Sequence, residues 1–594
     1  MFEPAKLNAQ PGFDAGNQSH PGRRARAVRP ALVVALAGAL LTAPTLALGT
    51  SFFDDSAQRR LIGAHLAGQR ADPWYDLFTW VAGDREQGKI ERQIGVRPWW
   101  SADDVRVRFL RPLAAATHYV DYIVWPEATW AMHLQSMLWY ALACAMAMVL
   151  CLRFEARRAV ALLGGTLYAL DDSHVRLVAW LAQRNALMGA ALSFAVLHLS
   201  FGPTLVRPAR ASLAALCFLA ALASSEGSLA ILAYPVAYAI VHRPTEVTPM
   251  LRKLVPMVLV AAVWFIAYQR LGYGARGSGA YLSPLTEVAY WYRLPSRVAA
   301  LLVYHVEFPP ALLRWLIPVE SLPLAHLITT AALAALVLAG LVAGFRRSTA
   351  FWALAALLSL MPAAVAEPHP RLLGFAGPAL AMLTAHALVG LWEFGRKRAL
   401  PARMGGLLAA PLAAAQLVLA PLSLLGDSAR FEADPAAMAA QLPALGPAPE
   451  LATQHLVVLY TPSLINAAAI PEARRRRGWS VPAMLTVLAP AKGSVTCRRF
   501  DGGFELRGGG LLDDPLARLW RGPSRPMQAG QHITMSSYDA EVVSVTDDGR
   551  PRIVRFRSTI GANLDSPHLR YLAWRGNGYE PIALPKPGAS IAFP

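Results

Sequence analysis

Charged residues and cysteine are both scarce in this chain. Only 16% of its 594 residues are charged and the mean hydropathy is +0.36, whereas about a quarter of a soluble chain is charged. Three of the four cysteines, Cys144, Cys151 and Cys217, lie inside apolar runs, and Cys497 stands alone in the C-terminal region. That region therefore has no internal disulfide. No Cys/His cluster has the spacing of a structural zinc site.

Apolar runs fill the first two thirds of the chain. Many have the roughly 17 to 25 residues that cross the hydrocarbon core of a bilayer, and the shorter ones are expected to be tilted, broken or buried in the bundle. We predict an α-helical polytopic membrane protein with about 11 transmembrane helices. The predicted spans are 30–50, 128–152, 157–171, 185–202, 211–224, 227–242, 252–269, 324–345, 348–366, 371–393 and 406–425.

Two segments leave the span count open. The apolar segment 297–318 is interrupted by His305, Glu307 and two prolines, and we interpret it as interfacial or re-entrant, with a full span as the alternative. The first run, which follows an arginine-rich start and ends near Ala47-Leu48-Gly49, has a cleaved signal peptide as its alternative interpretation.

The net charge of +18 is distributed between the apolar runs. Arginine clusters in alternate loops are typical of the cytoplasmic side, so we predict a cytoplasmic tail at 1–29 and outer positions for the long loop 51–127 and for 426–594. The chain is expected in a bacterial-type inner (cytoplasmic) membrane, with membrane lipid as the partner of these clusters. A nucleic-acid partner is not expected, because it would require a basic face on a soluble domain. The clusters are Arg23, Arg24, Arg26 and Arg29; Arg153, Arg157 and Arg158; Arg207 and Arg210; Arg252 and Lys253; Arg346 and Arg347; and Arg396, Lys397, Arg398 and Arg403.

Residues 426–594 have a different pattern. Short runs of β-forming residues alternate with turn signals such as Asp547-Asp548-Gly549, which predicts a β-rich extracytoplasmic domain. Within Arg552–Arg557, Ile553 and Phe556 break the strict alternation of a half-buried strand. The basic run Arg474–Arg477 beside Trp479 is interpreted as a solvated loop, with contact to anionic headgroups or polymer as the alternative. The expected strands are His455–Tyr460, Met484–Leu488, Gly503–Arg507, Ala540–Val545 and Arg552–Arg557.

Ionisable residues gather at the predicted outer ends of the helices. Such groups are costly at the membrane edge and mark function by default. Carboxylates interleaved with arginines suit a site that binds a phosphate and transfers a proton. The alternative is an ordinary polar loop, with Asp55 as a helix N-cap. The set comprises Asp54, Asp55, Asp103, Asp104, Arg111, Asp171, Asp172, His174, Trp180, Arg184, Asn185, Glu226, Glu367, His369 and Arg371.

Five short motifs in this set carry a family resemblance. Phe53-Asp54-Asp55 resembles the acidic motif of GT-C-type glycosyltransferases, which use polyprenyl-phosphate-linked sugars. Phe109–Leu113 followed by His133, and the segment Val178–Leu187, resemble elements of the protein O-mannosyltransferase-like branch. Ser224–Gly227 is similar to a short turn of that branch, with serine at 225 in place of the common lysine. Glu367–Leu373 resembles a late element without its tyrosine.

The resemblance covers about residues 30–425 and implies a GT-C-like domain there. It implies transfer of a sugar from a polyprenyl-phosphate donor to an acceptor, which is a protein, lipid or polysaccharide, on the outer face. Asp54 or Asp55 would be the catalytic base, with a slight preference for Asp55 because it lies further from the first helix. The implied substrate-binding residues are Arg111, His133, Arg184, Asn185, Glu226 and Arg371.

No cofactor is predicted, although two adjacent carboxylates leave open a divalent metal ion at Asp54 and Asp55. Two other functions are considered. A transporter or flippase of a lipid-linked saccharide would also need buried ionisable groups, but no internal repeat is visible in the sequence. A membrane scaffold that displays the β-rich domain would leave the outer carboxylates without a purpose.

Overall fold

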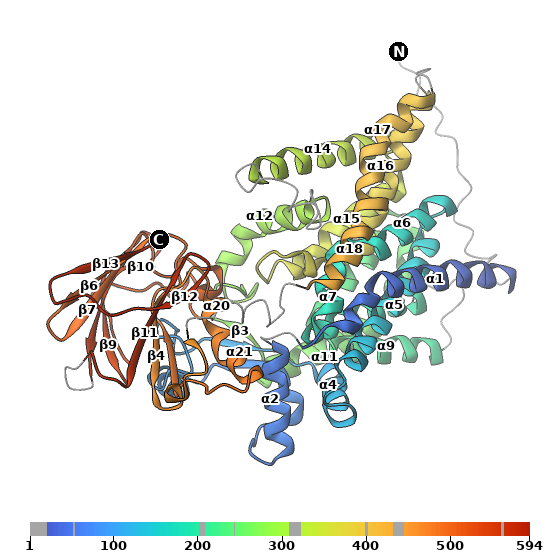
Figure 1. The fold of residues 1–594 in the computed structure, drawn as a ribbon. Coiled ribbons are helices and arrows are strands. Elements are labelled where there is room, and N and C mark those ends of the chain that lie inside the picture. The colour runs from blue at the N-terminus through green and yellow to red at the C-terminus, as the bar shows by residue number, and fades with distance from the viewer. Residues whose placement is uncertain are drawn as a thin grey trace.

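The computed structural model describes residues 21–50, 54–200, 208–242, 244–307, 322–397, 402–431, 445–559 and 564–594. Figure 1 shows a helical bundle beside a β-rich C-terminal part, with helices α20 and α21 and strand β3 between them. A mostly helical chain with a β-rich C-terminal region is therefore confirmed. Residues 1–20 of the predicted N-terminal tail, Phe53 of the acidic motif and residues 308–318 lie outside the described residues.

Every predicted span coincides with a helical element. Within the described residues, four helices are long and apolar enough to cross a membrane, namely Ala27–Ala47, Thr129–Phe154, Pro323–Ala343 and Gly406–Ala429. The count of eleven spans thus stays a prediction. The bundle elements are α1 (Pro21–Thr42), η1 (Ala43–Ala47), α5 (Thr129–Phe154), α6 (Arg158–Leu170), η3 (Asp172–His174), α7 (Val175–Ala179), η4 (Leu181–Gln183), α8 (Arg184–Ser200), α9 (Pro208–Leu222), η5 (Glu226–Leu232), α10 (Ala233–Val241), α11 (Pro244–Arg270), α12 (Val288–His305), α14 (Leu322–Ala343), α15 (Arg347–Ala363), η6 (Pro370–Leu373), α16 (Gly377–Lys397), α17 (Ala402–Ala414), η7 (Ala415–Leu419) and α18 (Ala420–Ala429).

The bundle packs as membrane helices do. On α14, large apolar side chains remain exposed, with Leu327 at 66% and Val342 at 70%, which suits a lipid-facing surface. The opposite side of α14 approaches α16 through small residues. A Cβ added to Gly340 would lie 2.3 Å from the carbonyl oxygen of Ala387, and one on Gly390 would lie 2.0 Å from that of Gly340. Only glycine allows this close approach of two helix backbones.

The long first loop is folded over its described residues, 54–127. It contributes two strands to a three-stranded sheet of order β1-β2-β3, whose third strand comes from the loop after α11. The sequence predicted only a long loop here, because strands of three or four residues carry too little periodicity to recognise. The elements are α2 (Asp54–Leu66), η2 (Trp74–Phe78), β1 (Thr79–Ala82), α3 (Arg85–Gln93), β2 (Arg106–Arg108), α4 (Pro112–Val124) and β3 (Gly274–Arg276).

The C-terminal region holds two sheets. One is an antiparallel sheet of order β13-β6-β7-β10-β9-β8, and the other is a mixed sheet of order β12-β11-β4-β5. All six residues of β4 are buried, as expected for a strand between two parallel neighbours. The elements are η9 (Pro449–Thr453), β4 (His455–Tyr460), α20 (Leu464–Ala468), α21 (Ile470–Arg476), β5 (Met484–Val487), β6 (Val495–Phe500), β7 (Gly503–Gly508), η10 (Pro515–Leu519), β8 (His532–Thr534), β9 (Tyr538–Val545), β10 (Pro551–Ser558), β11 (Leu569–Arg575), β12 (Gly578–Pro581) and β13 (Ser590–Phe593).

Strand β10 explains the irregular alternation in its sequence. Its pairing with β9 shifts register on both sides of Ile553. Such a bulge re-aims the side chains that follow it, so Val554 and Phe556 are both buried while Ile553 is only half-buried.

The first loop and the C-terminal region share one core. Trp99 and Trp100 of the loop are packed among the apolar residues of the two sheets. The indole Nε1 of Trp99 donates to the carbonyl of Leu488 at 3.0 Å, and that of Trp100 donates to Ala517 at 3.0 Å. Two buried indoles with satisfied donors make this a tightly held contact. The loop and the C-terminal region therefore form one unit at the same end of the bundle.

Candidate active site

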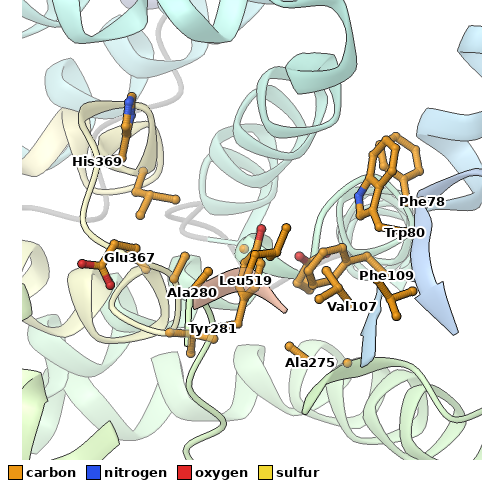
Figure 2. A pocket seen from close by; sticks show the side chains of 18 of the residues that line it. Phe78, Trp80, Val107, Phe109, Ala275, Ala280, Tyr281, Glu367, His369 and Leu519 are labelled. Carbon is orange, nitrogen blue, oxygen red and sulfur yellow. The ribbon is translucent and has the colours of Figure 1, made fainter. Parts of the chain in front are cut away.

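A cavity of about 1660 Å³ lies where the bundle, the first loop and the C-terminal region meet. Figure 2 shows Phe78, Trp80 and Phe109 of the first loop on one side and Glu367 and His369 on the other. Tyr281 and Leu519, from the loop after β3 and from η10, lie between the two sides. The wall is therefore built by segments that are far apart in the sequence.

Asp54 is the first residue of α2 and lines this cavity. Burial raises the pKa of its carboxyl to about 6, while the nearby charges of Arg371 and Arg111 act in the opposite direction. A carboxylate whose pKa lies close to neutral is suited to accept a proton during a reaction. Of the two predicted acidic residues, Asp54 is thus the one that faces the cavity.

Asp55 has a different environment. Its side chain is buried and its Oδ1 accepts a hydrogen bond from the backbone N–H of Ala182 in η4 at 2.7 Å. Asp55 does not line the cavity, so its position does not support the slight preference for it as the base. One residue further along α2 than Asp54, its carboxylate points toward the bundle and not into the cavity.

Asp54 lines the cavity, whereas Asp55 bonds to the backbone of Ala182. Among the described residues, no group of three or more His, Cys, Asp or Glu side chains has an arrangement that could hold a metal ion. A divalent ion at Asp54 and Asp55 stays a prediction, because a hard cation takes several oxygen ligands and two carboxylates supply only part of such a set.

Arg111, Glu226 and Asn185 form a connected group in the cavity wall. Arg111 donates from Nε to Glu226 Oε2 at 2.9 Å and from Nη2 to the other carboxylate oxygen, in a bidentate pair. When the Asn185 amide is oriented so that its nitrogen and its oxygen both form hydrogen bonds, the oxygen accepts from Arg111 Nη1 at 3.1 Å. The Arg111 guanidinium lies 4.5 Å from the ring centre of Phe109. The charge of Arg111 is therefore balanced, and its plane is held.

Arg371 is a second cation that lines the cavity, and its surroundings differ from those of Arg111. It lies in η6, with its guanidinium 5.3 Å from the ring centre of Trp180. Its buried Nε has no hydrogen-bond acceptor, and no carboxylate of the described part of the chain forms an ion pair with it. The backbone N–H of Arg371 donates to His369 Nδ1 at 3.2 Å. Burial, together with Arg371 and Arg176, lowers the pKa of His369 to about 3, so this ring is a neutral acceptor. The fork of Arg371 is available to an anionic ligand.

His133 and Arg184 were predicted to bind substrate, but neither lines the cavity. His133 Nε2 lies 3.2 Å from the carbonyl oxygen of Gly49. Arg184 is fully buried, with Nη1 at 2.5 Å from Asp121 Oδ2 and Nε at 3.0 Å from Ser136 Oγ. The expectation that Arg184 shares one cavity with Asp54 is corrected, because membrane depth alone does not determine which side of a helix faces the cavity.

Arg184→Met is expected to destabilise the fold instead of weakening ligand binding. Breaking a buried ion pair leaves an uncompensated charge and typically costs about 3–5 kcal/mol. Thermal unfolding in detergent would show a lower Tm, and the double variant Arg184→Met/Asp121→Leu should regain part of it. An unchanged Tm with lost ligand binding would restore Arg184 to the site.

The remaining groups of the predicted set are divided among three places. Glu367 lines the cavity and pairs with Arg297 at 2.9 Å. Asp104 binds Arg525 of the C-terminal region at 2.8 Å, and Asp103 pairs with Arg92. The buried Asp171, which lies 3.6 Å from His305, forms a separate cluster with the buried His174 and the half-buried Asp172, and this cluster does not line the cavity.

Sequence reasoning missed the contribution of the C-terminal region. The cavity is lined by ten arginine and lysine side chains against six carboxylates, and four of the ten, Arg475, Lys492, Arg518 and Arg525, come from that region. The basic run Arg474–Arg477 was the one available signal. Most of this run belongs to the helix α21 and not to a loop. Arg474 is fully buried and donates to the carbonyls of Ser480, Gly446 and Pro447, while the next three arginines are exposed. Contact of the exposed arginines with anionic headgroups or polymer stays a prediction.

No protein-family model and no curated protein matches the chain. Among solved structures, the chain is similar to the archaeal oligosaccharyltransferase AglB from Archaeoglobus fulgidus in complex with an inhibitory peptide and a dolichol-phosphate, with 13% identity and a TM-score of 0.35 over 73% of this chain and 64% of that chain. It is also similar to ArnT from Cupriavidus metallidurans bound to undecaprenyl phosphate, with 14% identity and a TM-score of 0.34 over 78% of this chain and 86% of that chain. This chain thus spans less than two thirds of the length of AglB.

Proposed function

We propose that this protein is a membrane glycosyltransferase that moves a sugar from a polyprenyl-phosphate donor to an acceptor at the outer face of the membrane. One observation carries the proposal. Asp54, a carboxylate with a pKa of about 6, and Arg371, a cation without a carboxylate partner among the described residues, line the same cavity, and the charge of Arg371 acts on Asp54. A proton acceptor and a phosphate-binding fork are the two groups that this transfer needs.

In the proposed reaction, Asp54 and Arg371 both act in a single displacement at the anomeric carbon of the sugar. The carboxylate of Asp54 takes the proton of the acceptor hydroxyl, and the oxygen so activated attacks the anomeric carbon of the sugar. The bond between that carbon and the phosphate oxygen breaks, and its electron pair leaves with the polyprenyl phosphate. Arg371 stabilises the charge that develops on this leaving group. Arg111, already balanced by Glu226, orients the donor by hydrogen bonds.

The two alternatives explain less of the geometry. A transporter needs a path to the inner face, but the end of the bundle away from the cavity is held by a buried pair, His386 at 2.9 Å from Glu155, and by a half-buried pair, Arg157 at 3.1 Å from Glu393. A scaffold that merely displays the C-terminal region is disfavoured because that region forms part of the cavity wall.

Selective binding of a lipid phosphate tests the proposal. Native mass spectrometry of the detergent-purified protein is expected to detect bound undecaprenyl phosphate but not undecaprenol at the same concentration. The purified protein should then transfer a labelled sugar from a polyprenyl-phosphate donor to a membrane fraction. Equal binding of the phosphate and the alcohol, without transfer, would contradict the proposal.

The proposed orientation predicts which loops face outward. Single cysteines placed at the exposed positions Asp72 and Ser590 should react with a membrane-impermeant maleimide in intact cells. A cysteine at the exposed Arg252 should react only after permeabilisation. The reason is the alternation of arginine clusters. A Cys217→Ala background keeps the signal clean, because the other native cysteines are buried. Labelling of Arg252→Cys in intact cells would reject the orientation.

A further inference from the structure

We infer that α21 of the C-terminal region is a positioning element for Asp54, and that Arg476 and Glu472 hold the start of α2 in place. The inference rests on the proposed function for the role of Asp54. Residues more than 400 positions away from Asp54 in the sequence thus help to set the position of the base.

Arg476 bridges the two sides of Asp54. Its Nη2 donates to the carbonyl oxygen of Thr50 at 2.9 Å and to the Thr50 hydroxyl at 3.0 Å. The same nitrogen lies 3.2 Å from the Ser56 hydroxyl. One guanidinium thus contacts the chain before and after Asp54, which restrains where α2 begins.

Glu472 adds a second contact one turn earlier on α21. It accepts from Arg60 Nη1 at 3.1 Å and forms a hydrogen bond with the Ser56 side chain. Arg475 donates to the same carboxylate at 2.7 Å. Several charge-assisted bonds on one carboxylate are stronger and more directional than an isolated surface pair.

These polar contacts matter because α2 has little apolar packing of its own. Its buried residues are Asp55, Ser56, Gln58 and Ile62, of which only Ile62 is apolar. Polar groups therefore determine the position of the helix start. Asp55 anchors it to the bundle through Ala182, and α21 anchors it to the C-terminal region.

The support itself is rigid. Ile470 and Ala473 of α21 are buried, and Arg474 is fixed by three backbone carbonyls. Residues whose own conformation is held by packing and hydrogen bonds are those that position a reactive group.

Hydrogen exchange of the whole purified protein tests the inference, with a matched control at the next residue. Arg477 has the same side chain, stacks on Trp479 at 4.8 Å, and forms no hydrogen bond or ion pair with α2 in the described part of the chain. Arg476→Ala is expected to accelerate amide exchange in the first two turns of α2 by about tenfold, through more frequent local opening. Arg477→Ala should leave that exchange unchanged. Unaltered α2 exchange in Arg476→Ala, or equal acceleration in both variants, would overturn the inference.

Transfer kinetics separate this inference from the proposed function. Arg476→Ala should lower kcat and shift the acidic limb of the pH profile, while KM for the donor changes little, because Arg371 is not displaced. Arg476→Lys, which keeps one donor, should recover part of kcat. If α2 loosens while kcat and the pH profile stay as in the wild type, the positioning role is wrong. If Asp54→Asn keeps full transfer, the proposed function fails whatever the exchange result.

Discussion

Asp54→Asn is expected to slow sugar transfer by about 10²- to 10⁴-fold, the usual cost of removing a general base. Asparagine keeps the size of the side chain and most of its hydrogen bonding but cannot accept the proton. The measurement is the initial rate of transfer from a polyprenyl-phosphate-linked sugar by purified protein, with Tm recorded to show that the variant is folded.

The pH dependence gives a second signature of the same residue. Burial raises the pKa of Asp54 to about 6, and the reactive form of a base is the deprotonated one. The wild-type rate should therefore rise with pH up to about 6 and level off above it, falling about tenfold per pH unit on the acidic side. The residual rate of Asp54→Asn should lack this limb.

Asp55→Asn is the matched control for Asp54→Asn. Its amide oxygen can still accept from the Ala182 N–H that Asp55 binds at 2.7 Å, so transfer should stay within a few-fold of the wild type, as for a change that keeps its hydrogen bond. Near-wild-type transfer by Asp54→Asn, or a larger loss in Asp55→Asn, would show that Asp54 is not the base.

Arg371→Gln is expected to lower transfer by about 10²- to 10³-fold, the typical effect of removing one donor from the centre that stabilises developing charge. Affinity for undecaprenyl phosphate, measured by native mass spectrometry, should fall as well. Arg371→Lys should be intermediate, because a lone ammonium keeps the charge but lacks the planar fork.

Arg276→Gln is the control for charge loss in the same cavity. Arg276 also lines the cavity, but its side chain is 57% exposed and lies 3.8 Å from Asp104. Exposed pairs contribute little, so this variant should bind and transfer almost as the wild type does. Equal losses in both variants would mean that the cavity attracts the donor by overall charge and not through Arg371.

Local sequence patterns predicted which segments form helices and which form the five expected strands. The apolar runs coincide with helices and the five expected strands correspond to β4, β5, β7, β9 and β10. Hydropathy and alternation depend on residues close in sequence, so they are readable without a fold. The three-stranded sheet of the first loop was missed, since its strands are short and β3 comes from a segment far along the chain.

By itself, the sequence determined that the chain is rich in membrane-length helices, that a β-rich region follows them, and that Asp54, Arg111, Glu226 and Arg371 belong to the set of candidate residues. Only the tertiary structure shows that Asp54 lines the cavity while Asp55 does not, that Arg184 is buried against Asp121, and that α21 contacts the start of α2. Adjacent residues on a helix point in directions about 100° apart, and contacts between distant segments leave no local pattern. The direction in which each candidate points is therefore a property of the packed chain.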